Sequence, residues 1–192
     1  MSTHTRLYDN WSDAMSVVDR LRAARISNDD ISVISPESDE NRVSDGAEAT
    51  AAGSGIGAVL GGGAGALAGV GLLAIPGLGP IVATGWFVST LAGLAAGAVA
   101  GGVAGGIIDA LTSSGLSSEE AEVYAEAIRR GGTMITVKVD DSQDALVARL
   151  LDETPPVDIS ERERVYREGG WTGYDPDVVP PTDDLTRRPP LI

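Results

Sequence analysis

The chain has 192 residues, which is enough for one ordinary domain or two small ones and excludes a large multidomain enzyme. It contains 28 acidic and 14 basic residues, and its formal net charge of -14 argues against nucleic-acid binding, which depends on clustered cations. There is no cysteine and only one histidine, His4. Disulfides and thiolate chemistry are therefore excluded. A single histidine also disfavours histidine-based catalytic triads and zinc sites that use several histidines.

Residues 3–35 predict the first of two βαβ halves. Thr3 begins a short strand at residues 3–8, and a helix follows from about residue 12 to residue 24. The apolar face of this helix has Ala14, Val17, Val18 and Leu21. A second apolar strand follows at residues 30–35, and residues 36–48 form an acidic linker.

Residues 49–110 predict a glycine-rich apolar helical hairpin. No charged side chain occurs from residue 49 to residue 108, and 18 of the 25 glycines lie in this stretch. The segment 76–80, PGLGP, divides it into two arms at residues 53–75 and 81–108. As helices, the arms would reach about 34 and 42 Å, against about 30 Å for the hydrocarbon core of a bilayer.

Small residues recur at intervals of four along both arms, as in glycine-zipper packing of helices. We expect these helix-packing residues to be Gly53, Gly57, Gly61, Gly65, Gly69, Gly85, Ser89, Gly93, Gly97, Gly101 and Gly105. We favour a hairpin in a membrane, because each interior glycine costs a helix about 1 kcal/mol in water, whereas lipid leaves the backbone little alternative to helix. A hairpin buried in a soluble oligomer stays open as an alternative, and the many Ala, Val, Leu and Ile residues disfavour a flexible linker.

Residues 116–159 predict an extra helix followed by the second βαβ half. Ser117 and Glu120 have the spacing of a capping box, which would open the extra helix. In chain order we expect that helix to end at residues 131–132, then a half-buried strand at 133–139, a helix at 142–151 and a short strand at 157–159. In the first of these strands, Thr136 and Lys138 lie on the polar side.

Two βαβ halves of this size predict an α+β fold, a ferredoxin-like split βαβ sandwich that the glycine-rich hairpin interrupts. Such a fold has four antiparallel strands and two helices on one face of the sheet. The other face would need a cover, either the extra helix or another copy of the chain. A homo-oligomer is therefore expected, and the glycine strips indicate it independently.

Residues 160–192 form a proline-rich acidic tail, whose composition suits an extended or partly disordered peptide. Within it, Trp171 and Tyr174 are two large amphipathic rings in an otherwise solvating stretch. Two alternatives stay open for them: docking on the folded domain or a neighbouring subunit, and plain disorder.

Several segments together resemble the bacterial general stress (heat-induced stress) proteins. These segments are the βαβ start, the central glycine-rich block, residues 119–124 (EEAEVY) running through 129–132 (RRGG) into 133–137 (TMITV), and residues 171–175 (WTGYD). The resemblance covers most of residues 3–159 and rests on architecture and short stretches. It implies a stress-associated protein without an established enzymatic activity, often described as membrane-associated through its glycine-rich part, and it supplies no active-site residues.

The residues themselves indicate no catalytic, cofactor-binding or metal-binding site. Adjacent carboxylates occur in several places, but none has the spacing of an EF-hand loop, and solvated loops and helix starts explain them better. We expect Ser12 and Ser117 to cap helices, because neither has a candidate base partner in the sequence. His4 is expected to be a surface or edge residue.

These observations lead to the hypothesis of a non-enzymatic general stress-response protein that associates with a membrane and with itself through the glycine-zipper hairpin. The expected location is the cytoplasmic membrane with both termini cytoplasmic, and the alternative is a cytoplasmic soluble oligomer. A ligand-sensing ferredoxin-like regulatory protein and an oligomeric membrane pore are the alternative functions. The expected partners are further copies of the chain and a lipid bilayer, with no nucleic acid and no cofactor.

Overall fold

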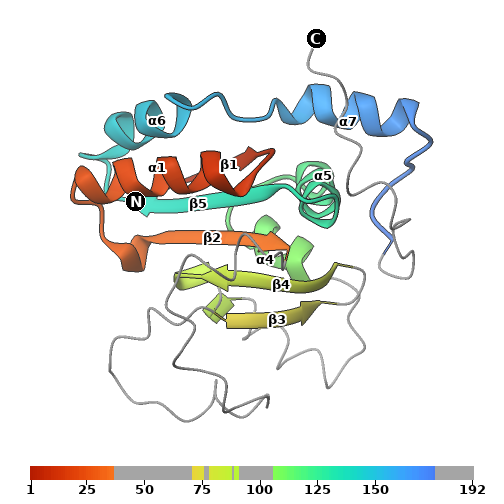
Figure 1. Ribbon diagram of the computed structural model, residues 1–192, viewed down its shortest axis with the longest axis horizontal. Coiled ribbons are helices and arrows are strands. Elements are labelled where there is room, and N and C mark those ends of the chain that lie inside the picture. Colours follow the sequence, from red (N-terminus) through yellow and green to blue (C-terminus); the bar gives the residue numbers. More distant parts are fainter. Residues whose placement is uncertain (37–70, 76–77, 88, 91–105, 176–192) are drawn as a thin grey trace.

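The fold comes from residues 1–36, 71–75, 78–87, 89–90 and 106–175, which a computed structural model describes (Figure 1). Within these ranges five strands form one antiparallel sheet in the order β1-β5-β2-β4-β3. The strands are β1 (Ser2–Tyr8), β2 (Ile31–Pro36), β3 (Gly71–Ile75), β4 (Gly79–Thr84) and β5 (Thr133–Val139). The helices are α1 (Trp11–Ala23), α4 (Gly106–Ser113), α5 (Ser118–Arg129), α6 (Asp144–Asp152) and α7 (Ile159–Glu168), with a short 3-10 turn η1 (Asn28–Asp30). The α+β class is confirmed.

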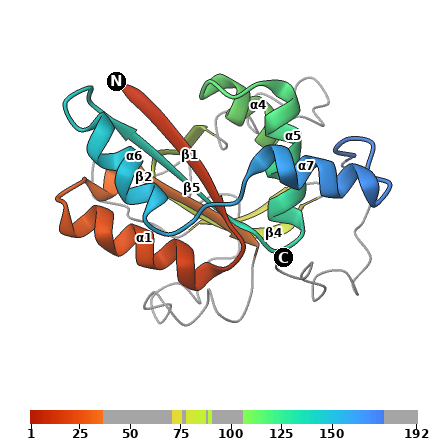
Figure 2. The ribbon, with the colours of Figure 1, turned by 90° about the horizontal axis from the view of Figure 1, so that it is seen from above.

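Helices cover both faces of the sheet (Figure 2). On one face α1 and α6 bury an apolar cluster. It includes Ala14, Val17, Val18 and Leu21 of α1, Ile31 and Val33 of β2, Ile135, Val137 and Val139 of β5, and Val147 and Leu151 of α6. On the other face α4 and α5 pack over a second cluster that includes Leu7, Ile34, Met134, Leu111, Val123 and Ile128. The face that needed a cover is thus covered within the chain by α5, the extra helix.

Of the two predicted helix caps, one is confirmed and the other is wrong. Ser117 accepts a hydrogen bond from the backbone N–H of Glu120, whose carboxylate accepts from the N–H of Ser117, so the predicted capping box is present. Helix α1 begins differently, because Asn10 caps it by accepting from the N–H of Asp13 at 2.8 Å. The prediction that Ser12 caps this helix is therefore wrong by two positions.

Strand β5 is buried on both sides, whereas the sequence predicted a half-buried strand. Thr136, expected on the polar side, is fully buried, and its hydroxyl lies 3.3 Å from the hydroxyl of Thr5 on β1. Lys138 is exposed as expected. The difference arises because the second face of the sheet is covered by α4 and α5, which a strand's own residue pattern does not report.

The predicted strand at residues 157–159 is wrong. Asp158 caps α7, and Ile159 already belongs to that helix. The segment nevertheless lies beside β1, because the backbone N–H of Val157 donates to the carbonyl of Leu7 at 2.8 Å. A single hydrogen bond at this position does not make a strand.

The glycine-rich block is not helical where the structure describes its central part. Residues of both expected helical arms form β3 and β4, which pair from Gly71 opposite Ala83 to Ile75 opposite Gly79. Strand β4 also pairs with β2, and there Ile81 and Ala83 are fully buried. The physical reason is that β2 offers an open edge, so that the backbone groups of the hairpin are satisfied without the cost of glycine in a helix.

The expected membrane location is also wrong. Among the residues that the structure describes, no helix has both the length and the apolar character needed to cross a bilayer.

Candidate functional site

Most of the predicted helix-packing residues lie outside the described residues. These are Gly53, Gly57, Gly61, Gly65, Gly69, Gly93, Gly97, Gly101 and Gly105. The two that are described do not form a common helical strip. Gly85 is in a bend directly after β4 with a φ of +84°, and Ser89 is an exposed residue of the helical positions 89–90.

Gly85 instead allows a close approach of the hairpin to β2. A Cβ atom at this position would lie 2.1 Å from the carbonyl oxygen of Ile31 and 2.5 Å from the hydroxyl of Ser32. Two residues later, the backbone N–H of Phe87 donates to the same hydroxyl at 3.0 Å, and the Phe87 ring is fully buried. The contacts of Gly85 and Phe87 therefore fix the end of the hairpin against the first half of the domain.

The hairpin ends the sheet with an uncharged edge. Strand β3 has the sequence GLLAI and pairs with β4 on one side only within the described part of the chain. Figure 1 shows it as the outermost strand. Edge strands present unpaired N–H and C=O groups, and proteins commonly protect them with charges or proline, neither of which occurs in β3. The edge of β3 is thus able to pair with another strand.

The opposite edge of the sheet carries charges along β1. The N-terminal amine lies 3.0 Å from Asp141, His4 Nε2 lies 2.8 Å from Asp144, and Arg6 Nε donates to Asp152 at 2.9 Å. Hydrogen bonds from Ser2 and His4 lower the pKa of Asp144, and the hydrogen bond to Asp152 raises the pKa of Arg6. His4 is an edge residue, as expected. The charged side chains along β1 oppose pairing with another strand, and the backbone N–H of Val157 donates to the carbonyl of Leu7 on this edge.

A buried ion cluster on α5 forms the base on which the C-terminal segment docks. Glu126 is fully buried and Arg129 is 6% exposed. The Glu126 carboxylate accepts from Arg129 and from Arg130, the latter at 2.5 Å, and Arg129 also donates to the backbone carbonyl of Asp175 at 3.3 Å. Because a buried charge needs a partner of opposite sign, the Glu126 carboxylate stabilises both Arg129, which is buried with it, and Arg130, which is partly exposed.

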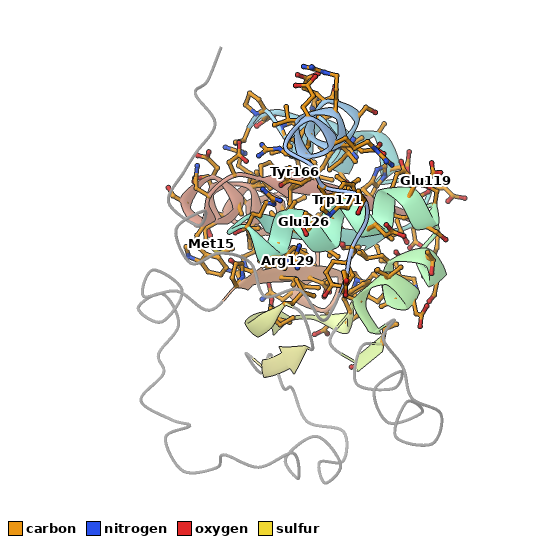
Figure 3. All side chains as sticks on the ribbon, turned by 90° about the vertical axis from the view of Figure 1, so that its right-hand side faces the viewer. Met15, Glu119, Glu126, Arg129, Tyr166 and Trp171 are labelled. Atoms are coloured by element: carbon orange, nitrogen blue, oxygen red, sulfur yellow. The ribbon has the colours of Figure 1, made fainter. Side chains whose placement is uncertain are left out.

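Aromatic rings complete this cluster (Figure 3). Trp171 is buried and meets Tyr166 of α7 edge to face, with ring centroids 6.0 Å apart. The backbone N–H of Tyr174 donates to Glu122 at 3.2 Å, and the Arg129 guanidinium lies 5.6 Å from the Tyr174 ring centroid. The structure therefore places both tail rings against the folded domain. The segment before them is the helix α7 rather than the expected extended peptide.

Three tyrosines, Tyr124 on α5, Tyr166 on α7 and Tyr174 after α7, serve as neutral structural groups. Burial raises the pKa of Tyr124 to about 12 and also raises the pKa of Tyr166 and Tyr174. The Tyr124 hydroxyl donates to the backbone carbonyl of Thr5 at 3.3 Å. A phenol whose pKa is raised further above its ordinary value of about 10 stays protonated at neutral pH, so these side chains pack or donate hydrogen bonds rather than act as bases. Over the described ranges, no group of acidic or histidine side chains is arranged to hold a metal ion.

The sequence reasoning missed two features that the structure brings out. Glu126, Arg129 and Arg130 have the i, i+3 and i, i+4 spacing of a helical ion cluster, a signal that was available in the sequence. Lys138 was noted only as the polar side of its strand, although it is the one lysine in the chain.

Comparisons with known proteins identify no relative of this chain. The chain matches no protein-family model, no curated protein and no solved structure. The resemblance to the general stress proteins accordingly remains a prediction from short stretches of sequence.

Proposed function

We propose that this chain is a non-enzymatic general stress-response protein that acts by self-association through its glycine-rich block. The observation that carries the self-association is the uncharged edge of β3, which ends the sheet with its outer side unpaired in the described part of the chain. The stress role comes from the resemblance of the segments 119–124 and 129–137, which lie on α5 and β5. A rise in the abundance of the protein after heat shock, followed by immunoblotting, tests that role.

A second copy is the partner that suits this edge. Every charge of the chain lies outside residues 49–108, so two molecules of net charge -14 repel each other least where their glycine-rich blocks meet. An antiparallel pair of β3 strands would place the same surface of both copies in contact, as a twofold dimer requires. Main-chain hydrogen bonds between the two edges would then extend the sheet across both molecules.

We also propose that the first and last parts of the chain form a ferredoxin-like core. Support comes from the strand order β1-β5-β2 and from the placement of α1 and α6 on the same face. In that fold a fourth strand lies beside the first, and Val157 donates its backbone N–H to Leu7 at this position. The glycine-rich hairpin would then be an addition at the opposite edge, beside β2.

The edge pairing is tested by placing a charge at the middle of β3. Leu73→Lys should lower the sedimentation mass of the full-length protein toward that of a single chain, because an edge lysine opposes strand pairing. The matched control is Ala145→Lys, which adds the same charge at an exposed position of α6. Equal masses for the unaltered protein and the Leu73→Lys variant, with circular dichroism unchanged, would contradict the proposal.

A further inference from the structure

A small polar cleft lies where the end of β5 meets the start of β1, the residues after β4 and the end of α4. Its volume is about 230 Å³. Its lining includes Thr3, Trp86, Thr90, Ser113, Ser114 and Lys138. They come from four separate parts of the chain, and only the folded sheet brings them together.

Lys138 is the unusual member of this group. It is the one lysine of a chain with 28 acidic residues, yet it forms no ion pair with any residue in the described ranges. Its ammonium lies 5.7 Å from the centroid of the Trp86 ring. Thr3 lies directly opposite Lys138 in the pairing of β1 with β5. The cleft therefore contains an available cation beside an aromatic face.

The hydroxyl groups in the cleft divide into two kinds. Ser113 and Ser114 already donate to backbone carbonyls of α4, those of Asp109 and Leu111, so their oxygens can only accept from a ligand. The hydroxyls of Thr3 and Thr90 form no hydrogen bond with the part of the chain that the structure describes. Two hydroxyl donors and one ammonium are thus available, which is a donor set for an anionic group.

The position of α4 limits the charge of that anion. Helix α4 ends at Ser113, so the negative end of its dipole lies at the cleft. One ammonium beside a helix C-terminus suits a single negative charge better than the double charge of a phosphate. The Trp86 ring adds a flat surface for an apolar or planar body.

We propose that this cleft binds a small monocarboxylate with a planar or apolar body. The carboxylate lies at Lys138 with hydrogen bonds from Thr3 and Thr90, and the body of the ligand packs against Trp86. This inference goes beyond the proposed function and does not depend on self-association, because none of these residues belongs to β3.

A larger depression along α7 does not compete with this assignment. Its volume is about 500 Å³, but the arginines that line it are already paired on the helix surface. Arg167 pairs with Glu163 at 2.7 Å and Arg164 pairs with Glu168 at 2.5 Å. Cations engaged in such pairs offer little to an incoming anion, so this depression is a solvated helix surface.

The test is calorimetric titration of the full-length protein with three probes: benzoate, the neutral benzamide, and inorganic phosphate. Benzoate should bind more tightly than either of the others. Lys138→Gln should weaken benzoate binding by about tenfold or more, since a hydrogen bond to a charged group is lost. Lys138→Arg should retain most of the affinity because it keeps the charge. Arg149→Gln is the matched control, because it removes one exposed cation from α6 on the other face of the sheet.

Several outcomes would overturn the proposal. If titration with benzoate released or absorbed no heat, the cleft would not be a binding site for it. If Lys138→Gln and Arg149→Gln lost affinity equally, the loss would come from the change in net charge and not from contact with Lys138. Phosphate or benzamide binding as tightly as benzoate would contradict the assignment of a monocarboxylate. Circular dichroism of each variant shows whether the fold is retained, and if Lys138→Gln fails to fold, the ranking of benzoate against benzamide and phosphate in the unaltered protein decides the result.

Discussion

The two ends of the sheet differ in how they meet their surroundings. At the β1 end, Arg6 and His4 pair with carboxylates of Asp152 and Asp144, and Val157 adds a backbone hydrogen bond. At the β3 end, residues 71–75 and 79–84 contain no charged side chain. The charged side chains that oppose strand pairing at the β1 edge are thus absent from the β3 edge. Electrostatic repulsion between two copies of the chain would be smallest if they met at the β3 edge.

The same contrast extends to the way each end is held together. The charged end, taken as the part of the domain outside residues 71–87, depends on a few polar clusters, of which Glu126 with Arg129 and Arg130 at the end of α5 is the most buried. The hairpin end depends on close backbone approach at Gly85 and on burial of Ile81 and Phe87. Substitutions should therefore destabilise the two ends by different mechanisms, and this difference can be measured.

The largest effect is expected at the charged end. Glu126→Ala would leave buried arginine charge without its carboxylate, so the free energy of unfolding should fall by about 3–5 kcal/mol. Denaturant titration followed by circular dichroism measures this loss. The control is Glu163→Ala, which removes a partly exposed partner of Arg167 and should cost about 0.5 kcal/mol. Similar losses in both variants would mean that burial does not distinguish the two ion pairs.

A smaller loss is expected at the hairpin end. Gly85→Ala would force a Cβ atom against the carbonyl of Ile31 at a positive φ, and it should lower the free energy of unfolding by about 2–3 kcal/mol. Gly131→Ala is the control, since Gly131 also has a positive φ but has no atom within 4 Å of its Cβ position. It should cost only about 1 kcal/mol for the left-handed conformation. If the two alanine variants were equally stable, the approach of the hairpin to β2 would not be tight.

The smallest effect concerns pH, to which only the charged end can respond directly. The hydrogen bonds from Ser117 lower the pKa of Glu120, so its contribution to stability is present above the ordinary carboxyl pKa and is lost as the pH falls through the folded value. Glu120→Gln keeps the capping geometry without the titration. Stability measured between pH 5 and about pH 2 should therefore depend slightly less on pH in this variant. An unchanged pH profile would show that Glu120 does not contribute.

Much of the charged end could be predicted from local sequence. The alternation of Ile135, Val137 and Val139 determined β5 to the residue, and Ser117 with Glu120 determined the start of α5. These local patterns predict the elements because strand alternation and helix capping both involve residues that are only two or three positions apart in the sequence. The docking of Trp171 could only be stated as one of two alternatives, because its partner Tyr166 becomes available only once α7 has formed and packed on α5.

The sequence by itself determined the α+β class, the uncharged character of residues 49–108 and the position of most elements at the two ends of the chain. Only the tertiary structure decided that residues 71–75 and 79–84 are strands. Apolar residues and glycines there fit a helix or a strand equally well by local pattern, and the choice depends on whether another strand offers an edge. Strand β2 provides that edge, and a distant edge leaves no trace in the local sequence of the segment that pairs with it.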